Sequence, residues 1–434
     1  MVDARSTALR LLIKLENNAG YSNIMLDNEL SRVKLDERDR HFAAALFYGV
    51  LERRLTLDKI IEKYLVRKQD KLASDIRNIL RLGIYQLKFM DSVPDHTAVD
   101  ESVKLVKANK NPALKGFVNG ILRGFIRDGK PVPKGSNRAE QMMYDYSCPI
   151  GLVEKYLDEY GEKAARAMLD SSLGAPPVTV RVNPMKCTED AAAKALEQEG
   201  IKCRKNDTLP FCFEISGGNI EKTKAYKDGL VHVQDISSQL CCAAVDAKAG
   251  MTVIDVCAAP GGKSFTIAQD MENRGALYSF DLHESRVRLI KSGAERLGLD
   301  VINAKVNNAK VYNEELPPAD RVLCDVPCSG LGVIRRKPEI KYKDLSEFER
   351  LPDIQAQILE TSSRYVKKGG VLVYSTCTLS RAENDEVVDG FLSIHKEFSP
   401  EPLGICFGEL ERVSITPDLY NSDGFFIAKF KRTE

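Results

Sequence analysis

The chain has 434 residues, of which 43% are hydrophobic and 29% are charged, and it includes 29 glycines and 18 prolines. This is the composition of ordinary globular domains, and it excludes a disordered, collagen-like or coiled-coil protein. No apolar run approaches the ~18 residues of a membrane span, and the first residues lack the apolar stretch and cleavage site of a secretory signal. We therefore expect a cytoplasmic protein of about two to four domains with no membrane association.

The net charge of +1 hides an uneven distribution along the chain. Residues 1–134 contain 25 lysines and arginines against 17 aspartates and glutamates, whereas the remaining 300 residues contain 38 against 45. A basic N-terminal module favours an anionic partner such as nucleic acid. A solvated helical surface without a special function is the simpler interpretation of the same charges.

Cysteine usage argues against both disulfides and zinc. All 11 cysteines lie at or after Cys148, no C-x-x-C pair occurs, and the five histidines are isolated in the sequence. An odd number of cysteines without a secretory signal is not typical of a disulfide framework, and isolated histidines lack the spacing of a zinc site. We expect no bound metal, and we expect one or two chemically active thiols among mostly buried ones.

Residues 4–127 have the periodicity of consecutive helices. Apolar residues such as Leu11, Leu12 and Leu15 recur at helical spacing, and no segment alternates like a strand. We therefore expect an all-helical domain over residues 1–134, with a linker rich in glycine and proline at 128–137.

A small α+β domain is expected over residues 141–232. An amphipathic helix begins near Ile150, and a short strand follows over 178–184. The next segment predicts a helix that is capped by Thr188 and ends at Gly200.

Apolar strands alternate with helical segments over residues 233–434. The expected strands are 252–256, 276–281, 301–306, 321–326 and 370–377, with 424–432 as an edge strand. This alternation predicts a largely parallel sheet with helices on both faces. Sites in such sheets lie at the carboxyl ends of the strands, so the residues that follow the strands are the candidates for chemistry.

The first of these junctions is a glycine-rich loop between a strand and a helix. Its residues are Cys257, Ala258, Ala259, Pro260, Gly261, Gly262 and Lys263. Glycines permit a close approach of the backbone to a ligand, and a helix N-terminus favours polar or anionic groups. Asp281 ends the next strand 20 residues after Gly261, which is the spacing of an acid that binds ribose hydroxyls. Loop and acid together predict a cofactor that contains a nucleoside, and the simpler alternative is a plain strand–turn–helix corner.

Two other nucleotide sites fit this loop less well. The G-x-G-x-x-G fingerprint is absent, which argues against NAD. Gly262-Lys263-Ser264 is similar to the end of a P-loop, so a nucleotide hydrolase is an alternative. However, Cys257 stands where the P-loop motif needs glycine, and Pro260 lies inside the loop.

Two further junctions place thiols at the same edge of the sheet. Cys328 follows the strand that ends at Asp325, and Cys377 ends the strand over 370–377. A single cysteine at a strand end is most simply a packing residue. Two of them, together with an acid and a cofactor loop, form a more specific arrangement that suits nucleophilic catalysis.

A basic loop follows the Cys328 junction. Its charged residues are Arg335, Arg336 and Lys337. Such a loop is usually solvated surface, but beside the site it would contact RNA phosphates.

Three motifs together resemble the RNA (cytosine-5)-methyltransferases of the Nop2/Sun family. They are DVCAAPGGK (255–263), DVPCSG (325–330) and YSTCTLSRAEN (374–384), and the helical N-terminal segment resembles NusB. The resemblance covers nearly the whole chain and is strongest over 233–384. It implies an all-α NusB-like N-terminal domain, a small α+β insert and a C-terminal α/β Rossmann-like, S-adenosylmethionine-dependent methyltransferase domain over 233–434.

The resemblance also implies a cofactor and its binding residues. S-adenosylmethionine would be bound by the loop 257–263, by Asp281 at the ribose, by Asn308 near the adenine and by Asp325. The family usually has an aspartate at the position of Asn308. An asparagine still provides an acceptor oxygen but carries no charge, so we expect weaker binding there.

The catalytic roles follow from the same resemblance, since the motif residues alone leave either cysteine as the attacking group. Cys377 would add to carbon 6 of a cytidine in small-subunit (16S) ribosomal RNA, and Cys328 would assist product release. Asp325 would hydrogen-bond the cytosine, and Lys263 would stabilise a thiolate or orient Asp325.

The RNA would have to present its target base to these groups. A cytosine can do so only when it is unpaired or flipped out. Residues 1–134 and 141–232 would bind the RNA, and we expect a monomer. A non-catalytic RNA-binding or assembly factor is the remaining alternative, because NusB is itself an antitermination factor.

Overall fold

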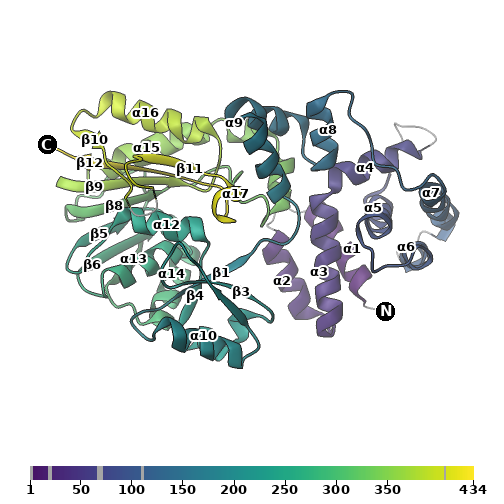
Figure 1. Ribbon diagram of the computed structural model, residues 1–434, viewed down its shortest axis with the longest axis horizontal. Coiled ribbons are helices and arrows are strands. Elements are labelled where there is room, and N and C mark those ends of the chain that lie inside the picture. Colours follow the sequence, from purple (N-terminus) through teal and green to yellow (C-terminus); the bar gives the residue numbers. More distant parts are fainter. Residues whose placement is uncertain (1–2, 18–21, 66–71, 109–111, 405–406) are drawn as a thin grey trace. The chain divides into compact units, whose positions relative to one another are not determined.

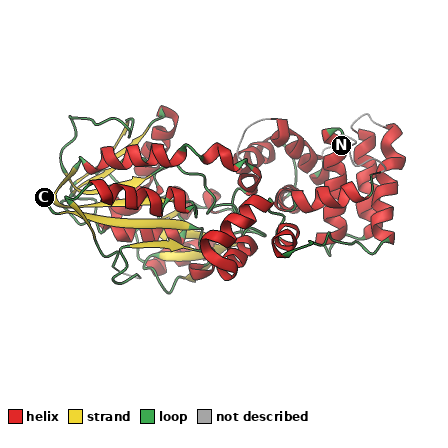
Figure 2. Cartoon of the chain, turned by 90° about the horizontal axis from the view of Figure 1, so that it is seen from above, coloured by secondary structure: helices red, strands yellow, loops and turns green. Residues whose placement is uncertain are grey.

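The computed structural model describes residues 3–17, 22–65, 72–108, 112–404 and 407–434. These residues form two compact units, and the chain crosses between them more than once. The first unit consists of Met1–Ala175 and Ile334–Leu345, and the second of Pro176–Val333 and Ser346–Glu434. Coloured by secondary structure, the described part of the chain has its strands in the second unit alone (Figure 2).

The first unit is all-helical, and its described helices between residues 4 and 127 agree with the helical periodicity of the sequence. Apolar residues at helical spacing, such as Leu11, Leu46, Ile79 and Leu122, are fully buried in one core. Its helices are α1 (Ala4–Asn17), α2 (Ser22–Arg32), α3 (Glu37–Glu52), α4 (Arg54–Lys63), α5 (Ser74–Phe89), α6 (Asp95–Ala108), α7 (Lys115–Arg127), α8 (Arg138–Asp145) and α9 (Ile150–Ser171), with 3-10 turns η1 (Pro112–Leu114) and η3 (Pro338–Tyr342).

A segment distant in sequence, Ile334–Leu345, completes this helical unit. Lys341 in η3 is only 2% exposed, and its Nζ donates to the carbonyl oxygens of Glu52 at 2.8 Å and Tyr146 at 3.1 Å. Burial lowers the pKa of Lys341 to about 8. The Tyr342 hydroxyl also donates to the Glu52 carbonyl, at 3.2 Å. Without the helices these buried groups would lose their acceptors, so the segment and the helices fold together.

The second unit begins with a small antiparallel sheet in the order β2-β3-β1-β4. The helix predicted beside it forms: the Thr188 side chain accepts from the Ala191 N–H at its start, and Gly200 follows its end with φ +82°. The elements are β1 (Val178–Val182), α10 (Glu189–Gln198), β2 (Lys202–Lys205), β3 (Cys212–Ser216), η2 (Ile220–Lys222), α11 (Lys224–Lys227) and β4 (Val231–Val233).

The rest of the second unit is an eight-stranded mixed sheet with the main order β10-β12-β9-β8-β5-β6-β7 and β11 paired to β12. The ladders from β9 through β8 and β5 to β6 and β7 are parallel, as predicted, and β12 runs antiparallel to β9. The strands are β5 (Thr252–Asp255), β6 (Ala276–Asp281), β7 (Ile302–Val306), β8 (Ala319–Asp325), β9 (Val366–Thr376), β10 (Phe398–Pro400), β11 (Arg412–Ile415) and β12 (Phe425–Arg432).

The expectation that 424–432 forms an edge strand is wrong. Strand β12 lies between β9 on one side and β10 and β11 on the other. Its first six residues, FFIAKF, are all buried, because both faces of the strand are covered. An uninterrupted buried run is typical of an interior strand.

Helices cover both faces of this sheet, as Figure 1 shows. Alternate strand residues point to opposite sides: Val253 and Leu277 pack with one group of helices, and Ile254 and Phe280 pack with the other. The first group is α12 (Ile236–Val245), α13 (Gly262–Asp270) and α14 (Glu284–Leu297), and the second is α15 (Leu351–Ser363) and α16 (Asp385–Ile394). The carboxyl ends of the parallel strands are therefore the accessible edge.

A buried histidine joins the small sheet to a helix that packs on the large one. His232 on β4 is 2% exposed, and its Nε2 lies 3.3 Å from the Thr266 hydroxyl on α13. Burial, helped by the positive charge of Arg181, lowers the pKa of His232 to about 3. The imidazole therefore stays neutral in the folded protein over a pH range in which the unfolded chain takes up a proton.

We predict that His232 destabilises the second unit in acid. The unfolded chain binds a proton below pH ~6.5 and the folded chain only near pH 3, so stability falls as the pH drops between these values. At pH 4.5 the loss attributable to this residue is ~2.5 kcal/mol. Urea unfolding at pH 7 and pH 4.5 should show a smaller acid loss in His232→Gln than in the wild type. Equal losses in the two proteins would contradict the prediction.

Candidate active site

The loop between β5 and α13 has a backbone that only glycine permits at one position. Gly261 has φ +115°, and a Cβ on it would lie 2.3 Å from the ring of Phe265. A Cβ on the next residue, Gly262, would meet nothing closer than the Gln234 amide at 4.0 Å. The first turn of α13 therefore has open space beside its backbone, as a bound ligand would need.

Gln234 supports this loop and was missed by the sequence reasoning. Its Nε2 donates to the Gly262 carbonyl at 3.1 Å, and its Oε1 accepts from the Thr266 hydroxyl at 2.6 Å. Gln234 is 5% exposed and directly precedes Asp235, the N-cap of α12. The sequence does show a polar residue between a strand and a capped helix, which is a sign of a structural role. It does not show that the partner of Gln234 is Gly262, 28 residues away.

Two acids end the neighbouring strands. Asp255 at the end of β5 is fully buried and accepts from the Ser264 hydroxyl at 2.7 Å, and burial raises its pKa to about 7. Asp281 at the end of β6 is 5% exposed. It accepts from the His283 N–H at 3.1 Å and pairs with Arg286 at 3.2 Å.

The loop after β7 runs beside Asp281. The Asn307 N–H donates to the Asp281 carbonyl at 3.1 Å, and the next residue, Asn308, is exposed. Asn308 Oδ1 accepts from the Lys310 N–H at 3.1 Å and keeps a second lone pair for a ligand. A carboxylate, an exposed amide and a helix N-terminus with open space fit the hydroxyl and amino groups of a nucleoside cofactor.

A lysine and a serine fix the acid at the end of β8. Lys263 Nζ donates to Asp325 Oδ2 at 2.8 Å, and the Ser375 hydroxyl donates to Oδ1 at 2.8 Å. Burial disfavours the charged lysine, but the negative charge of Asp325 outweighs it and raises the pKa of Lys263 above its usual value. Lys263 is thus held protonated, and both oxygens of the Asp325 carboxyl group are oriented by hydrogen bonds.

The two predicted thiols meet beyond this acid. The Sγ atoms of Cys328 and Cys377 lie 3.2 Å apart. The parallel ladder of β8 and β9 ends where Asp325 pairs with Ser375, and the cysteines follow directly. The hydrogen bond with Cys377, together with burial, raises the pKa of Cys328 well above its usual value. Cys328 therefore keeps its proton, and its S–H can stabilise a thiolate on Cys377.

The expected cofactor and catalytic residues belong to one unit, and the basic loop belongs to the other. Residues 257–263, Asp281, Asn308, Asp325 and the two cysteines all lie in the second unit. Arg335, Arg336 and Lys337 lie in the segment Ile334–Leu345, which belongs to the helical unit. Their contact with RNA phosphates stays a prediction.

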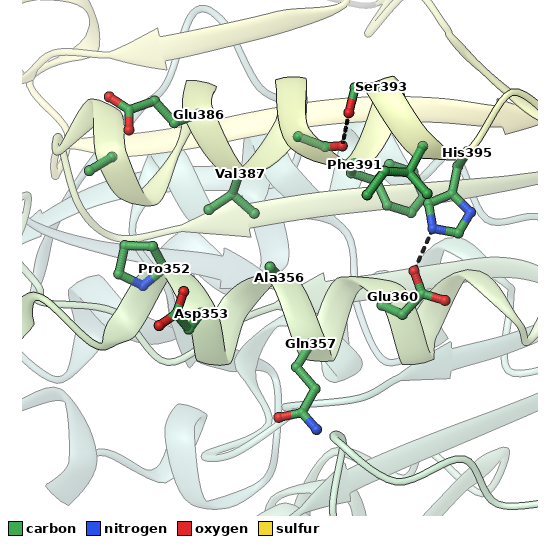
Figure 3. Close-up of a pocket in the computed structure, with 13 residues that line it drawn as sticks. Pro352, Asp353, Ala356, Gln357, Glu360, Glu386, Val387, Phe391, Ser393 and His395 are labelled. Atoms are coloured by element: carbon green, nitrogen blue, oxygen red, sulfur yellow. Dashed lines mark hydrogen bonds and ion pairs between the residues drawn. The ribbon is translucent and has the colours of Figure 1, made fainter.

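A separate hollow of about 510 Å³ lies between α15 and α16 (Figure 3). Val387 and Phe391 form part of its wall, and Asp353, Glu360 and Glu386 add carboxylates. His395 closes one end through its hydrogen bond to Glu360. None of the expected site residues lines this hollow. The candidate active site is therefore the group of residues at the strand ends, and the hollow is a separate feature.

The described residues also bear on the expectations for thiols, metal and membrane. The ten cysteines within them are free thiols, and Cys406 lies outside them. In the same part of the chain no three side chains form a group suited to a metal ion. No helix there has both the length and the apolar character needed to cross a bilayer.

A doubly covered α/β sheet with a glycine-rich loop after one strand and an acid at the end of the next is typical of enzymes that use a nucleoside cofactor. Family models identify the chain further. One described as "16S rRNA methyltransferase RsmB/F" matches residues 242–431, one described as "NusB family" matches 2–127, and one described as "Methyltr_RsmF/B-like, ferredoxin-like domain" matches 149–219.

Curated relatives match over the full chain. The "Probable ribosomal RNA small subunit methyltransferase B" of Bacillus subtilis (strain 168) is 38% identical over 440 residues, covering 99% of this chain and 98% of that protein. The protein of the same name from Synechocystis sp. is 33% identical over 455 residues, covering 100% of both. The chain therefore belongs to the RsmB/F family of 16S rRNA methyltransferases.

A solved structure supports the fold. The protein named PH0851 has a TM-score of 0.83 and 24% identity, covering 100% of this chain and 99% of that one. The expected fold class is confirmed: a NusB-like helical domain, an α+β insert with a ferredoxin-like match, and a methyltransferase domain with a mixed sheet.

Proposed function

We propose that this protein transfers a methyl group from S-adenosylmethionine to carbon 5 of a cytidine in small-subunit ribosomal RNA, through a covalent adduct between Cys377 and carbon 6. The observation that carries the proposal is the pair of thiols 3.2 Å apart, next to an acid held by a lysine. Family membership supports the rRNA substrate, and the thiol pair supports the carbon-5 chemistry.

The chemistry needs a nucleophile because carbon 5 of cytosine is itself a poor one. Addition of the Cys377 thiolate to carbon 6 breaks the aromaticity and makes carbon 5 enamine-like, so that it can accept the methyl group. The proton on carbon 5 then passes to a base, the carbon 5–carbon 6 double bond re-forms and the Cys377 thiolate is expelled. Cys328 keeps its proton while Cys377 attacks. Once Cys377 is bonded to carbon 6, we assign to Cys328 the role of that base, as the thiolate left after its own proton has passed to solvent.

Asp325 and Lys263 prepare the base for attack. We assign to Asp325 a hydrogen bond to the cytosine: the carboxylate accepts from the amino group, or shares a proton with ring nitrogen 3, which takes up the negative charge that the thiolate addition places on the ring. Lys263 and Ser375 hold the two carboxylate oxygens in place. The bound cofactor supplies an electrophilic methyl group, and we assign its binding to residues 257–263, Asp281 and Asn308, with Asp325 alongside.

RNA affinity is assigned to the helical segment 1–134 and to the insert 141–232. The excess of basic residues in 1–134 suits phosphate contacts, whose strength falls with salt. We propose a single copy of the chain as the active form, acting on an unpaired or flipped-out cytidine.

Transfer of a tritiated methyl group tests this proposal. The purified chain is incubated with labelled S-adenosylmethionine and deproteinised small-subunit rRNA, and the RNA is digested to nucleosides. Label in 5-methylcytidine supports the proposal, and label in another nucleoside overturns its carbon-5 part. Magnesium-dependent nucleotide binding without any transfer would instead favour the nucleotide-hydrolase alternative. RNA binding alone would favour an assembly factor.

We predict that Asn308→Asp tightens cofactor binding by about 3- to 10-fold, because a carboxylate makes a stronger hydrogen bond to an amino group than an amide does. Isothermal titration calorimetry with S-adenosylmethionine measures the change. The control is Asn303→Asp. Asn303 is an exposed residue of β7 outside the expected site, and the substitution adds the same charge. An unchanged or weaker affinity in Asn308→Asp would remove Asn308 from the binding site.

A further inference from the structure

The two cysteines lie on different loops, and the strands alone do not fix their separation. The parallel ladder of β8 and β9 ends at Asp325 and Ser375. Cys328 lies three residues beyond it on one strand and Cys377 two residues beyond it on the other. Beyond the ladder the two loops share a backbone hydrogen bond, from the Gly332 N–H to the Cys377 carbonyl at 3.0 Å, but Gly332 lies four residues past Cys328. Side-chain contacts beside the two cysteines are therefore needed to fix the sulfur atoms 3.2 Å apart.

A buried carboxylate connects the two loops. Glu383, in the 3-10 turn η5 (Arg381–Glu383), is 2% exposed. Its Oε2 accepts from the Ser329 backbone N–H at 2.9 Å, and its Oε1 accepts from the Ser329 hydroxyl at 2.5 Å. The Thr378 hydroxyl lies 2.7 Å from that of Ser329 and 3.4 Å from the carboxylate. Ser329 follows Cys328, and Thr378 follows Cys377.

The next residue, Asn384, forms hydrogen bonds with the Cys377 loop on both sides of the cysteine. Asn384 is fully buried. Its Nδ2 donates to the Thr378 carbonyl at 3.1 Å, and its Oδ1 accepts from the Thr376 hydroxyl at 2.6 Å. Thr376 and Thr378 flank Cys377, so the loop that carries the thiol is tied down before and after it.

The helix α15 anchors the carboxylate from outside the loops. Gln355 Nε2 donates to Glu383 Oε2 at 2.9 Å and to the Pro327 carbonyl at 3.0 Å. Every hydrogen-bond donor named here for Glu383 is neutral, and a buried carboxylate is tolerated only when its oxygens are satisfied in this way. A glutamine would turn its NH₂ group toward one of these donors and leave that contact unmade.

We propose that Glu383 is the positioning residue that holds Cys328 and Cys377 adjacent, with Asn384 fixing the Cys377 side. The proposal deepens the proposed function and rests on it for the roles of the two thiols. Glu383 acts through Ser329 and Thr378, so removing its acceptor oxygen lets the Cys328 loop move away from Cys377. A displacement of about 1 Å is enough to lower turnover ~100-fold.

Phenylarsine oxide tests the adjacency without RNA or methyl transfer, because a trivalent arsenical binds two neighbouring thiols at once. The full chain is titrated under reducing conditions, and the binding lost in Cys377→Ala defines the signal from this pair. In Glu383→Gln we expect that signal to weaken by about 10-fold or more. Glu386→Gln, an exposed residue of α16 beside the hollow of Figure 3, is the matched control and should bind like the wild type.

A second readout separates positioning from general damage. In Glu383→Gln, kcat for methyl transfer should fall ~100-fold while KM for S-adenosylmethionine stays within about 2-fold. Wild-type arsenical affinity in Glu383→Gln overturns the proposal. If Glu383→Gln does not fold, Ser329→Ala removes one hydroxyl donor and should weaken the same signal, and unchanged binding there overturns the proposal equally. Arsenical binding tests the positioning role of Glu383 independently of methyl transfer. A wild-type protein that methylates no rRNA would overturn the proposed function and would leave the arsenical test unaffected.

Discussion

Cys377→Ala should lose methyl transfer to rRNA by at least ~10⁴-fold, because without the thiolate nothing adds to carbon 6 and carbon 5 stays unreactive. Cofactor affinity should not change, since the expected binding residues lie on other loops. The tritium assay gives the first quantity and calorimetry the second. The covalent step is the reason that we expect a complete loss rather than a partial one.

Cys324→Ala provides the matched control for this loss. Cys324 is on β8, four residues before Cys328, and is fully buried in the core on the α15 side of the sheet. Its replacement removes a thiol from the strand that leads to the Cys328 loop without removing any of the expected site residues, so most of the activity should remain. Substantial transfer by Cys377→Ala would show that Cys377 is not the nucleophile.

Cys328→Ala should accumulate a covalent complex with RNA. The attack by Cys377 and the methyl transfer still occur, but elimination is impaired, so the adduct persists. Denaturing gel electrophoresis after incubation with rRNA and S-adenosylmethionine detects it as a band of reduced mobility, and turnover should fall ~100-fold or more.

The double variant Cys328→Ala/Cys377→Ala identifies the sulfur that is attached. It should form no adduct, because the attacking thiol is gone. An adduct in Cys377→Ala and none in Cys328→Ala would reverse the two assignments.

The parallel strands and their junctions could be predicted because their signals are local. The apolar runs that end at Asp255, Asp281 and Asp325 each stop at an acid, and each strand forms within a few residues of its predicted bounds. The position of β12 could not be predicted the same way. A terminal strand gives no local sign of which neighbours it has, although the unbroken apolar run FFIAKF in β12 does indicate that both of its faces are buried.

Contacts between residues far apart in the chain could not be predicted from the sequence. In the sequence Lys341 is one charge in a basic stretch, but in the structure it is buried against Glu52 and Tyr146, almost 300 and 200 residues away in the chain. Glu383 and Asn384 did carry a signal. They lie four residues before the buried Val387 and Val388, on the inner face of the helix that follows, where a polar pair is costly unless it is bonded. Their partners across the sheet edge were visible only in the structure.

Trapping with modified RNA identifies the sulfur atom that attacks the cytosine. Small-subunit rRNA is transcribed with 5-fluorocytidine in place of cytidine and incubated with the chain and S-adenosylmethionine. Fluorine on carbon 5 cannot leave as a proton does, so the adduct formed by the attacking sulfur is frozen. Peptide mass spectrometry after nuclease digestion should find Cys377 bonded to a nucleotide that carries both fluorine and a methyl group on carbon 5. Attachment at Cys328, or no attachment while unmodified rRNA is methylated at carbon 5, would contradict the account.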